Sequence, residues 1–147
     1  MIGAFNNHFK QICINLNPIK KVFVLGLSGG MDSMALLYLL KNFSDNNKSF
    51  DTEIYPIIID HNLRQESSKE AHEVENLAKK LGFKTSIKKI SGKKPTGNIQ
   101  NWARKKRRDL LCESTSKLSA NLLLAHHFDD QAETLFMRFA KKSGLDG

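Results

Sequence analysis

A short segment rich in serine and glycine has the residue types and spacing to bind an anion. It reads Ser28-Gly29-Gly30-Met31-Asp32-Ser33 and separates an apolar run from a helix-forming segment. Backbone N–H groups at a strand-to-helix turn, together with the positive end of the helix dipole, attract negative charge. Adjacent glycines also let the backbone approach a phosphate closely. The segment therefore predicts a phosphate site, and an ordinary tight turn is the alternative.

The spacing excludes two other phosphate-binding loops. The segment has neither the Gly-x-x-x-x-Gly-Lys-Ser/Thr of a Walker A loop nor the Gly-x-Gly-x-x-Gly of a dinucleotide-binding turn. Asp32 cannot favour a bare phosphate, because like charges repel. We therefore assign it to Mg²⁺, which takes oxygen ligands and bridges phosphates. A carboxylate that caps the helix or lies in its first turn is the structural alternative.

The pattern around this segment predicts alternating strands and helices. Strands are expected at 21–27, 53–60, 83–88 and 121–125, with loops at 45–49 and 91–97. Helices are expected at 2–15, 33–43, 98–117 and 128–141. A further helix is expected to open with the capping pair Ser67 and Glu70 and to close at Gly82.

This alternation predicts the α/β class, with a doubly wound, mostly parallel sheet covered by helices on both faces. The near-continuous apolar strands agree, because such strands are buried on both sides. Ligands bind beyond the carboxyl ends of the strands in sheets of this type. Polar clusters follow three strands there: Ser28-Gly29-Gly30, Asp60-His61 and His126-His127. We expect these clusters to meet at one edge.

Composition indicates a basic, globular chain. The 147 residues fit one domain, and the net charge of +8 favours polyanionic partners. Ten Lys or Arg and no Asp or Glu lie between Lys84 and Arg108. Cys13 and Cys112 form no Cys-x-x-Cys motif and are expected as reduced thiols. No apolar run suits a membrane span and the N-terminus lacks a signal-peptide layout, so we expect a soluble cytoplasmic protein without membrane contact.

The motifs, taken in order, resemble one family. The segment 28–33 is similar to the signature loop of the PP-loop ATP pyrophosphatases. Asp60–Arg64, the block from Gly97 to Arg107, and Ala125–Thr134 resemble the blocks of the tRNA(Ile)-lysidine synthetase family. That family usually continues with Arg-Gly-Ser-Gly-Leu, where this chain has Lys141-Lys142-Ser143-Gly144-Leu145. We expect residues 1–147 to form one nucleotide-binding domain, truncated at its C-terminal end and without the family's C-terminal domains.

The resemblance implies a ligase that uses ATP and Mg²⁺. Such an enzyme adenylates the C2 carbonyl oxygen of a cytidine in the anticodon of isoleucine tRNA, releasing pyrophosphate. Free L-lysine then attacks that carbon and displaces AMP. Ser28, Gly29, Gly30, Met31 and Ser33 would cradle the β and γ phosphates.

Two side chains after the second strand are assigned to the adenosine pocket. Asp60 and His61 would line it, and Arg64 would reach a phosphate or the RNA. The sequence leaves an alternative open, in which Asp60 caps an Asx turn and Arg64 lies on the surface.

The resemblance places the acid–base chemistry in the cluster after the fourth strand. The attacking lysine must be a neutral amine, so a carboxylate or imidazole must accept a proton. His127 and Asp130 are the preferred pair, and His126 and Asp129 would position ATP or metal. Adjacent histidines lack the i,i+4 spacing of a helical zinc pair. Helix capping by the two aspartates is the alternative.

A run of cations in the predicted helix 98–117 is assigned to tRNA. Arg104 and Arg107 are three residues apart, share a helix face and match the family block. We assign both to RNA phosphate or the reacting site. Lys105, Lys106 and Arg108 would add general attraction to tRNA, and a solvated surface is the alternative.

Two other functions stay open at this stage. One is tRNA thiolation by the same type of loop, which generally recruits catalytic cysteines, whereas both cysteines here are predicted inside helices. The other is a fragment that binds ATP or RNA without catalysis. The sequence does not give the oligomeric state, and a homodimer is one of the states it leaves open.

Overall fold

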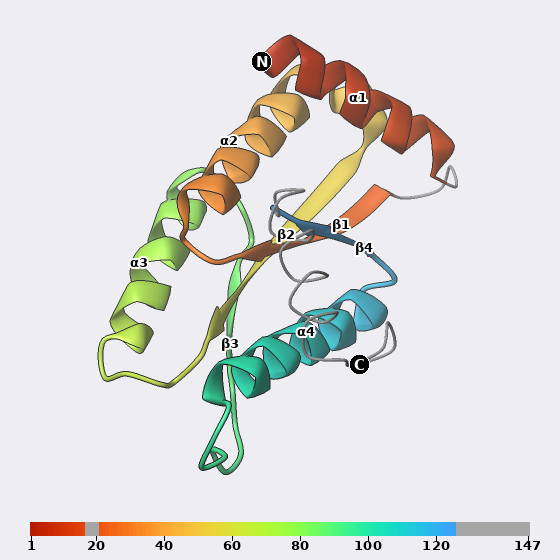
Figure 1. Cartoon of the computed structure of the whole chain (residues 1–147). Coiled ribbons are helices and arrows are strands. Elements are labelled where there is room, and N and C mark those ends of the chain that lie inside the picture. Colours follow the sequence, from red (N-terminus) through yellow and green to blue (C-terminus); the bar gives the residue numbers. More distant parts are fainter. Residues whose placement is uncertain (17–20, 126–147) are drawn as a thin grey trace.

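The structure, a computed structural model, describes residues 1–16 and 21–125 and contains a parallel sheet flanked by helices (Figure 1). The helices are α1 (Ile2–Asn15), α2 (Met31–Asn46), α3 (Ser67–Lys80) and α4 (Ile99–Lys117), with a short 3₁₀ helix at Lys48–Phe50. The strands are β1 (Lys21–Leu27), β2 (Thr52–Asp60), β3 (Ser86–Lys89) and β4 (Asn121–Leu124). All pair in parallel in the order β3-β2-β1-β4. The predicted helix at 128–141 lies outside the described residues.

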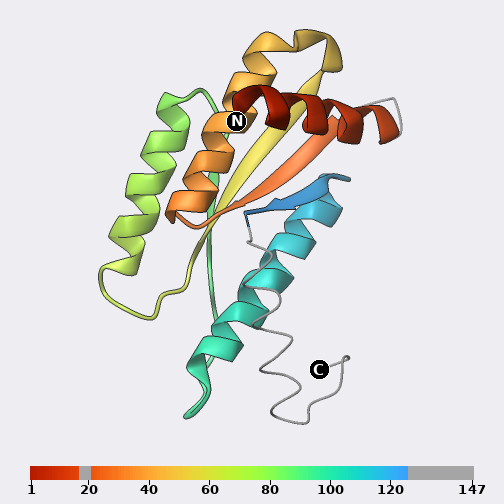
Figure 2. The same ribbon diagram turned by 45° about the horizontal axis from the view of Figure 1, so that its top comes forward.

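Side-chain alternation along the strands builds a core on each face of the sheet. Phe23 and Leu25 of β1 pack toward α1, α2 and α3, whereas Val24 between them packs toward α4. Ile58 and Ile57 of β2 divide in the same way. Figures 1 and 2 show α4 alone on its side of the sheet among the described helices. The doubly wound prediction is therefore confirmed.

The N-terminal helix joins the core through aromatic rings. Phe9 lies against Phe23 and Phe43, with ring centroids 5.1 and 4.8 Å apart. Its contact with Phe43 is edge-to-face, a favoured geometry for aromatic pairs. The predicted bounds of this helix match α1.

The second helix is longer than predicted at both ends. It begins at Met31, directly after the loop, because Gly30 is already its N-cap residue. At the other end, Asn46 and Asn47 donate side-chain N–H groups to the carbonyls of Asn42 and Phe43, at 2.8 and 2.9 Å. These bonds satisfy carbonyls that a helix end leaves open, so the helix includes the first two residues of the loop predicted at 45–49.

The predicted capping pair of α3 is wrong, whereas its predicted end is correct. Glu66 is the N-cap residue, and the hydroxyl of Ser67 donates to the carbonyl of Arg64 at 2.8 Å. At the C-terminus, Gly82 has φ +89°, and its N–H donates to Lys79 while the next N–H donates to Ala78. This is a Schellman motif, which favours glycine at that position.

The edge strands are shorter than predicted. β3 occupies only the end of the predicted 83–88 segment and extends to Lys89, and β4 ends at Leu124. Among the described strands, β3 and β4 are the outermost two, and both offer little unpaired backbone to another strand. Within residues 1–16 and 21–125, no helix is long and apolar enough to cross a membrane.

Candidate functional site

The strand order places the candidate site at the carboxyl edge of the sheet. The chain moves outward from β1 through β2 to β3 and then returns to the other side of β1 as β4. Because all strands are parallel, the segments that follow them leave at one edge. Such a reversal beside β1 is where open α/β sheets bind ligands. The segments after β1 and β2 lie on this edge, as predicted (Figure 2).

The loop after β1 requires glycine at its second position. Gly29 has φ +81°, a left-handed conformation that other residues adopt at a cost. A Cβ at this position would lie 2.6 Å from Cγ2 of Val74 on α3, which is closer than carbon atoms can approach. Gly30 differs, because its φ is −68° and a Cβ there would only touch the Ser28 hydroxyl at 3.4 Å.

Two serine hydroxyls hold the loop in shape. The Ser33 hydroxyl donates to the carbonyl of Gly30 at 2.9 Å and accepts the N–H of Ser28 at 3.3 Å. It also lies 3.0 Å from the Ser28 hydroxyl, which accepts the N–H of Gly30 at 3.3 Å. Ser33 is buried, so its side chain shapes the loop from inside. The two predicted phosphate-binding serines thus pre-organise the turn.

The start of α2 presents backbone donors at the same place. The first intrahelical bond runs from the N–H of Met34 to the carbonyl of Gly30, so the N–H groups of the first turn lie at the N-terminal end of the helix. The N-cap glycine has no side chain to cap them. Met31 is 86% exposed, and Asp32 lies exposed in the first turn rather than at the N-cap. This arrangement can receive an anion.

Asp60 at the end of β2 is engaged within the protein. It is 2% exposed, and one carboxylate oxygen accepts the N–H of Asn62 at 2.8 Å. The other oxygen lies 3.9 Å from the ammonium group of Lys89. Of the two interpretations that the sequence left open for this residue, the Asx turn is present. A contribution of Asp60 to nucleotide binding stays a prediction.

His61 lies beside the cations of α4. Burial is the main cause that lowers the pKa of His61, and the nearby charge of Arg107 lowers it further, while Asp60 opposes the shift. Its Nδ1 atom is buried without a hydrogen-bond partner in the described structure. Burial, followed by the charge of Arg104, also lowers the pKa of Arg107. The fold therefore joins the predicted adenosine pocket to the predicted tRNA-binding helix.

The other predicted cations are more exposed. Arg104, Lys105, Lys106 and Arg108 are all exposed on α4, and only Arg107 of this run is partly buried. Arg64 lies in the segment after β2, where its side chain is 70% exposed and pairs with Glu70 of α3 at 3.3 Å. Arg64 thus lies on the surface, as the alternative interpretation of the sequence expected. Its contact with RNA stays a prediction.

The cluster of His126, His127, Asp129 and Asp130 lies outside the described residues, so its predicted role stays a prediction. Within the described ranges, no three His, Cys, Asp or Glu side chains group as metal ligands. The two cysteines are free and lie in helices, as predicted. Cys13 is buried in α1, whereas Cys112 is exposed on α4, which packs on the opposite face of the sheet.

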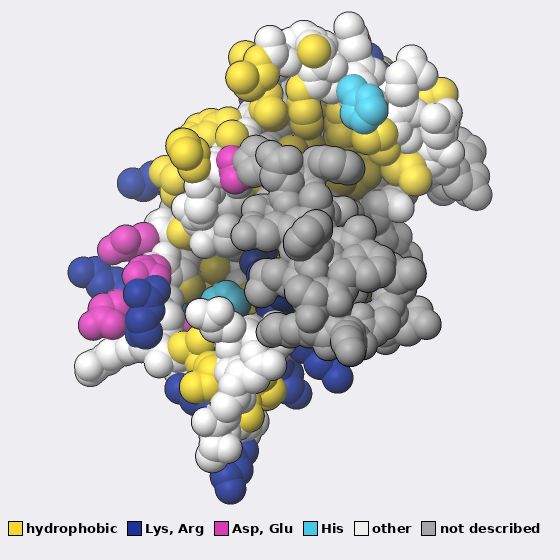
Figure 3. Space-filling view, viewed as in Figure 1, with side chains coloured by type: hydrophobic (Ala, Val, Ile, Leu, Met, Phe, Trp, Pro, Cys, Tyr) yellow, Lys and Arg dark blue, Asp and Glu magenta, His cyan; other side chains and the backbone are white. Residues whose placement is uncertain are grey.

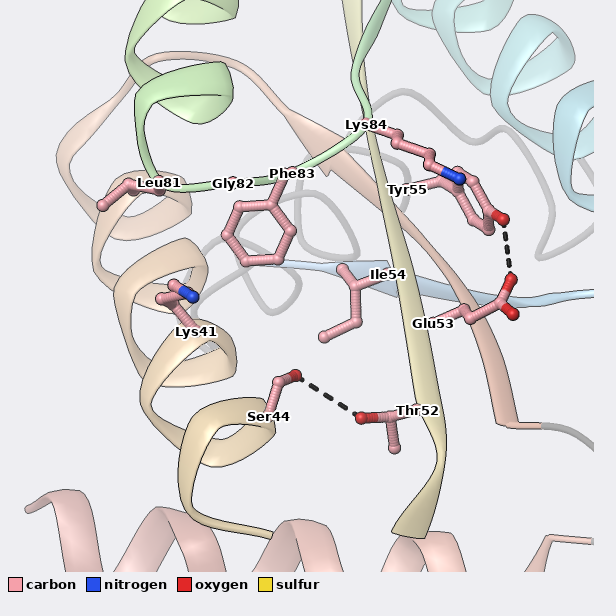
Figure 4. Close-up of a pocket in the computed structure, with 10 residues that line it drawn as sticks. All are labelled: Lys41, Ser44, Thr52, Glu53, Ile54, Tyr55, Leu81, Gly82, Phe83 and Lys84. Carbon is pink, nitrogen blue, oxygen red and sulfur yellow. Dashed lines mark hydrogen bonds between the residues drawn. The ribbon is translucent and has the colours of Figure 1, made fainter. Parts of the chain in front are cut away.

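A pocket of about 320 Å³ lies at the amino-terminal edge of the sheet, opposite the candidate site (Figure 4). It is lined by the amino-terminal end of β2, the last turns of α2 and the segment between α3 and β3. Four of its polar side chains pair with one another: Tyr55 donates to Glu53 at 2.7 Å, and the hydroxyls of Ser44 and Thr52 lie 3.4 Å apart. Parallel sheets bind ligands at the opposite edge, so we do not assign the nucleotide to this pocket.

Sequence reasoning missed three residues that support the site. Val74 presses on Gly29, Lys89 approaches Asp60, and Asn62 completes the turn after β2 with φ +49°. Val74 recurs at helical spacing with Ala71 and Ala78, which indicates an apolar helix face, but that pattern does not show which loop the face covers. The pairing of Asp60 with Lys89 joins segments 29 residues apart, and no local pattern connects them.

Comparisons with known proteins agree with this geometry. A family profile described as the PP-loop domain matches residues 2–147. The chain is 43% identical to the tRNA(Ile)-lysidine synthase of Wolbachia pipientis wMel over 84% of its own length and 28% of that protein. It is 38% identical to the protein of the same name from Wolbachia sp. subsp. Brugia malayi (strain TRS), over 95% of its length and 32% of that protein. The chain thus spans about a third or less of these curated relatives.

A solved structure shows a similar fold. The U34-tRNA thiolase NcsA from Methanococcus maripaludis, with its [4Fe-4S] cluster, superposes with a TM-score of 0.72. The match covers 96% of this chain and 51% of the thiolase at 18% sequence identity, so it bears on the fold alone. The profile match, together with a serine–glycine loop at the carboxyl edge of a doubly wound sheet, shows that the chain belongs to the PP-loop domain family.

Proposed function

We propose that this chain is the nucleotide-binding part of a ligase that joins L-lysine to isoleucine tRNA. The reaction would form lysidine at the first anticodon position and consume ATP. The observation that carries the proposal is the loop 28–33, where a left-handed glycine and two linked serines present helix N–H groups at the carboxyl edge. The choice of reaction rests on relatives named tRNA(Ile)-lysidine synthase at 38 to 43% identity.

The loop is suited to hold the part of ATP that leaves. Adenylation breaks the bond between the α and β phosphates, so pyrophosphate departs with negative charge. Backbone N–H groups of Gly29 and Met31 would bind that charge with little reorganisation, because the serine hydroxyls already set the turn. The N–H of Gly30 donates to the Ser28 hydroxyl and would help to keep that turn in shape. Asp60 and His61 would border the adenosine at the end of β2.

Mg²⁺ fits beside this loop. Magnesium typically binds through one or two carboxylates together with phosphate oxygens and water. Asp32 offers an exposed carboxylate in the first turn of α2, next to the phosphate seat. We assign the metal to Asp32 and the bound phosphates, where the ion would neutralise charge on the leaving pyrophosphate.

The two chemical steps balance without a further reactant. In the first, the C2 carbonyl oxygen of cytidine bonds to the α phosphorus of ATP and pyrophosphate leaves. In the second, the neutral amine of lysine bonds to C2, the C2–O bond breaks and AMP leaves with that oxygen. The amine loses a proton, which His127 or Asp130 would accept. Arg104 and Arg107 would face the phosphate or the RNA.

A lysine-transfer assay tests this function. Radiolabelled lysine, ATP and isoleucine tRNA would be incubated with this chain and with a longer version of the protein that includes the region its relatives have beyond it. We expect magnesium-dependent ATP binding by this chain and lysine transfer by the longer version. Transfer of sulfur, or no lysine attached to a tRNA with cytidine at the first anticodon position, would show that the proposal is wrong.

Replacement of Asp32 tests the metal assignment. We expect Asp32→Asn to reduce adenylation of tRNA by at least about a hundredfold, because the charge that holds the metal at the phosphates is lost. Asp45→Asn is the matched control, since Asp45 is also exposed but lies near the other end of α2, paired with Lys41. Both variants should retain the wild-type circular dichroism spectrum. Unaltered adenylation by Asp32→Asn would remove this residue from the metal site.

A further inference from the structure

The positive charge of the chain is confined to one stretch. Residues 84–108 hold ten of the 23 Lys and Arg and none of the 15 Asp and Glu. The remaining residues hold 13 basic and 15 acidic side chains, a net charge of −2. The whole positive excess therefore belongs to the segment before β3, β3 itself, the loop 90–98 and the first half of α4. On the face seen in Figure 3, Lys and Arg side chains without Asp or Glu lie on the lowest part of the molecule.

Part of this stretch forms a projecting arm that the proposed function does not use. We define the basic arm as residues 88–94, with Lys88, Lys89, Lys93 and Lys94. Its base is fixed, because Ile90 is 4% exposed and donates its N–H to the carbonyl of Asp60 at 2.9 Å. Beyond Ile90 the loop extends past the ends of β3 and α4 (Figures 1 and 2).

The two halves of the arm differ in what accounts for their charge. Lys88 and Lys89 lie on an edge strand, where lysine commonly prevents pairing with another sheet. Lys89 also approaches Asp60. Lys93 and Lys94 belong to no strand, are exposed, and have no ion pair within the described part of the chain. Protection of the edge therefore does not explain them.

The arm begins at the same edge as the phosphate loop. β3 is parallel to β1 and β2, so the segment after it leaves beside the segments that carry Ser28 and His61. The exposed cations of α4, which are Arg104, Lys105, Lys106 and Arg108, add further positive charge to this part of the surface. A partner of mixed charge would require acidic residues among these cations, whereas a nucleic-acid backbone is uniformly negative.

We propose that Lys93 and Lys94 of the basic arm bind the phosphate backbone of an RNA whose reacting nucleotide lies at the carboxyl edge. The inference rests on the proposed function for the identity of that RNA. The arm would hold the strand beside the site, and Arg104 and Arg107 would contact it nearer the reacting base.

Binding of isoleucine tRNA to this chain at a series of KCl concentrations tests the arm. Each phosphate contact contributes about 0.7 to 0.9 to the slope of log K against log salt. We expect Lys93→Gln/Lys94→Gln to lower that slope by about 1 to 2 and to weaken binding severalfold at about 0.1 M salt. Lys79→Gln/Lys80→Gln is the matched control, because it removes an adjacent, exposed lysine pair on α3 and changes the net charge equally. The control should keep the wild-type slope.

Three results would overturn the proposal: equal slopes for both double variants, no salt-dependent binding of tRNA by the wild-type chain, or binding of polyglutamate by a chain that does not bind tRNA. The last would assign the arm to an acidic protein. Failure of the proposed function is distinguishable, because the lysine-transfer assay reads it separately. A loss of slope confined to the arm variant, with no lysine transfer by the longer protein, would retain the RNA-binding arm and reject the ligase.

Discussion

The two faces of the sheet are built for different tasks. The face under α1, α2 and α3 has twelve buried core residues in the described part of the chain, with aromatic rings from helix and strand in contact. The face under α4 has six, and its helix carries the run of cations. Surface charges on the first face pair locally, as in Lys79 with Glu75 and Arg64 with Glu70. On α4, Lys117 pairs with Glu113, beyond the run of cations.

This difference indicates which face stabilises the loop after β1. A thick apolar core fixes β1 and the start of α2, and hence the loop between them. Within residues 1–16 and 21–125, the core beneath α4 is thinner and docks that one helix, whose run of cations is mostly exposed. The loop that closes the site is therefore stabilised mainly from the face that carries little of the excess charge.

The largest effect expected from this comparison is on folding. Phe43→Ala should lower the free energy of unfolding by about 3 to 5 kcal/mol, because Phe43 is fully buried between Phe9 and Phe50. Leu111→Ala, on the α4 face, should cost about 2 to 3 kcal/mol, toward the lower end for a buried leucine. Urea unfolding followed by circular dichroism would measure both.

An equal or larger cost for Leu111→Ala would contradict the ranking of the two faces. If Phe43→Ala does not fold, Phe43→Leu retains more of the volume and can be compared with Leu111→Val. Of those two milder variants, Phe43→Leu should again cost more free energy of unfolding than Leu111→Val.

The next effect concerns the loop that α3 covers. Gly29→Ala should destabilise the protein by about 1 to 3 kcal/mol, because φ +81° disfavours alanine and its Cβ would clash with Val74. It should also weaken ATP binding more than about tenfold, which corresponds to about 1.4 kcal/mol. Calorimetric titration with ATP and urea unfolding give the two quantities.

Gly30→Ala is the matched control for that loop. Its φ of −68° suits alanine and its Cβ would meet only a hydroxyl, so its stability should change by less than about 1 kcal/mol in either direction. Equal destabilisation by the two alanines would show that the contact with α3 does not constrain the loop.

The smallest expected effect is on the pH dependence of stability and concerns His61, which follows β2 at the carboxyl edge and lies near α4. Burial, with help from Arg107, lowers the pKa of His61 below its ordinary value of 6.5. As the pH falls below 6.5, the unfolded chain binds a proton that the folded chain resists, so stability decreases. His61→Gln should remove this part of the pH dependence between pH 7.5 and 5.5, as measured by urea unfolding.

Arg107→Gln sharpens the same test. It removes the nearby positive charge that, after burial, lowers the pKa of His61 most. The pKa of His61 should therefore rise toward its ordinary value, and the loss of stability at acid pH should decrease. The change should be smaller than that of His61→Gln. An unchanged dependence on pH in both variants would separate His61 from the charge of α4.

Local patterns were sufficient for much of the fold. The bounds of α1 and β1, the end of α3 at Gly82 and the carboxyl-edge location of the loop follow from periodicity, a glycine C-cap and strand alternation. Predictions failed where a side chain could form a hydrogen bond with more than one backbone group. Ser67 bonds to Arg64 rather than capping its helix, and Asn46 extends α2 into the predicted loop.

The site divides in the same way. The sequence by itself determined the class of fold, the serine–glycine loop after β1 and the concentration of cations near α4, because each depends on neighbouring residues. Only the tertiary structure decided that Val74 closes on Gly29, that Lys89 approaches Asp60 and that Arg107 acts on His61. Each of these pairs joins separate elements, and their proximity results from the packing of helices on a parallel sheet, which no local pattern encodes.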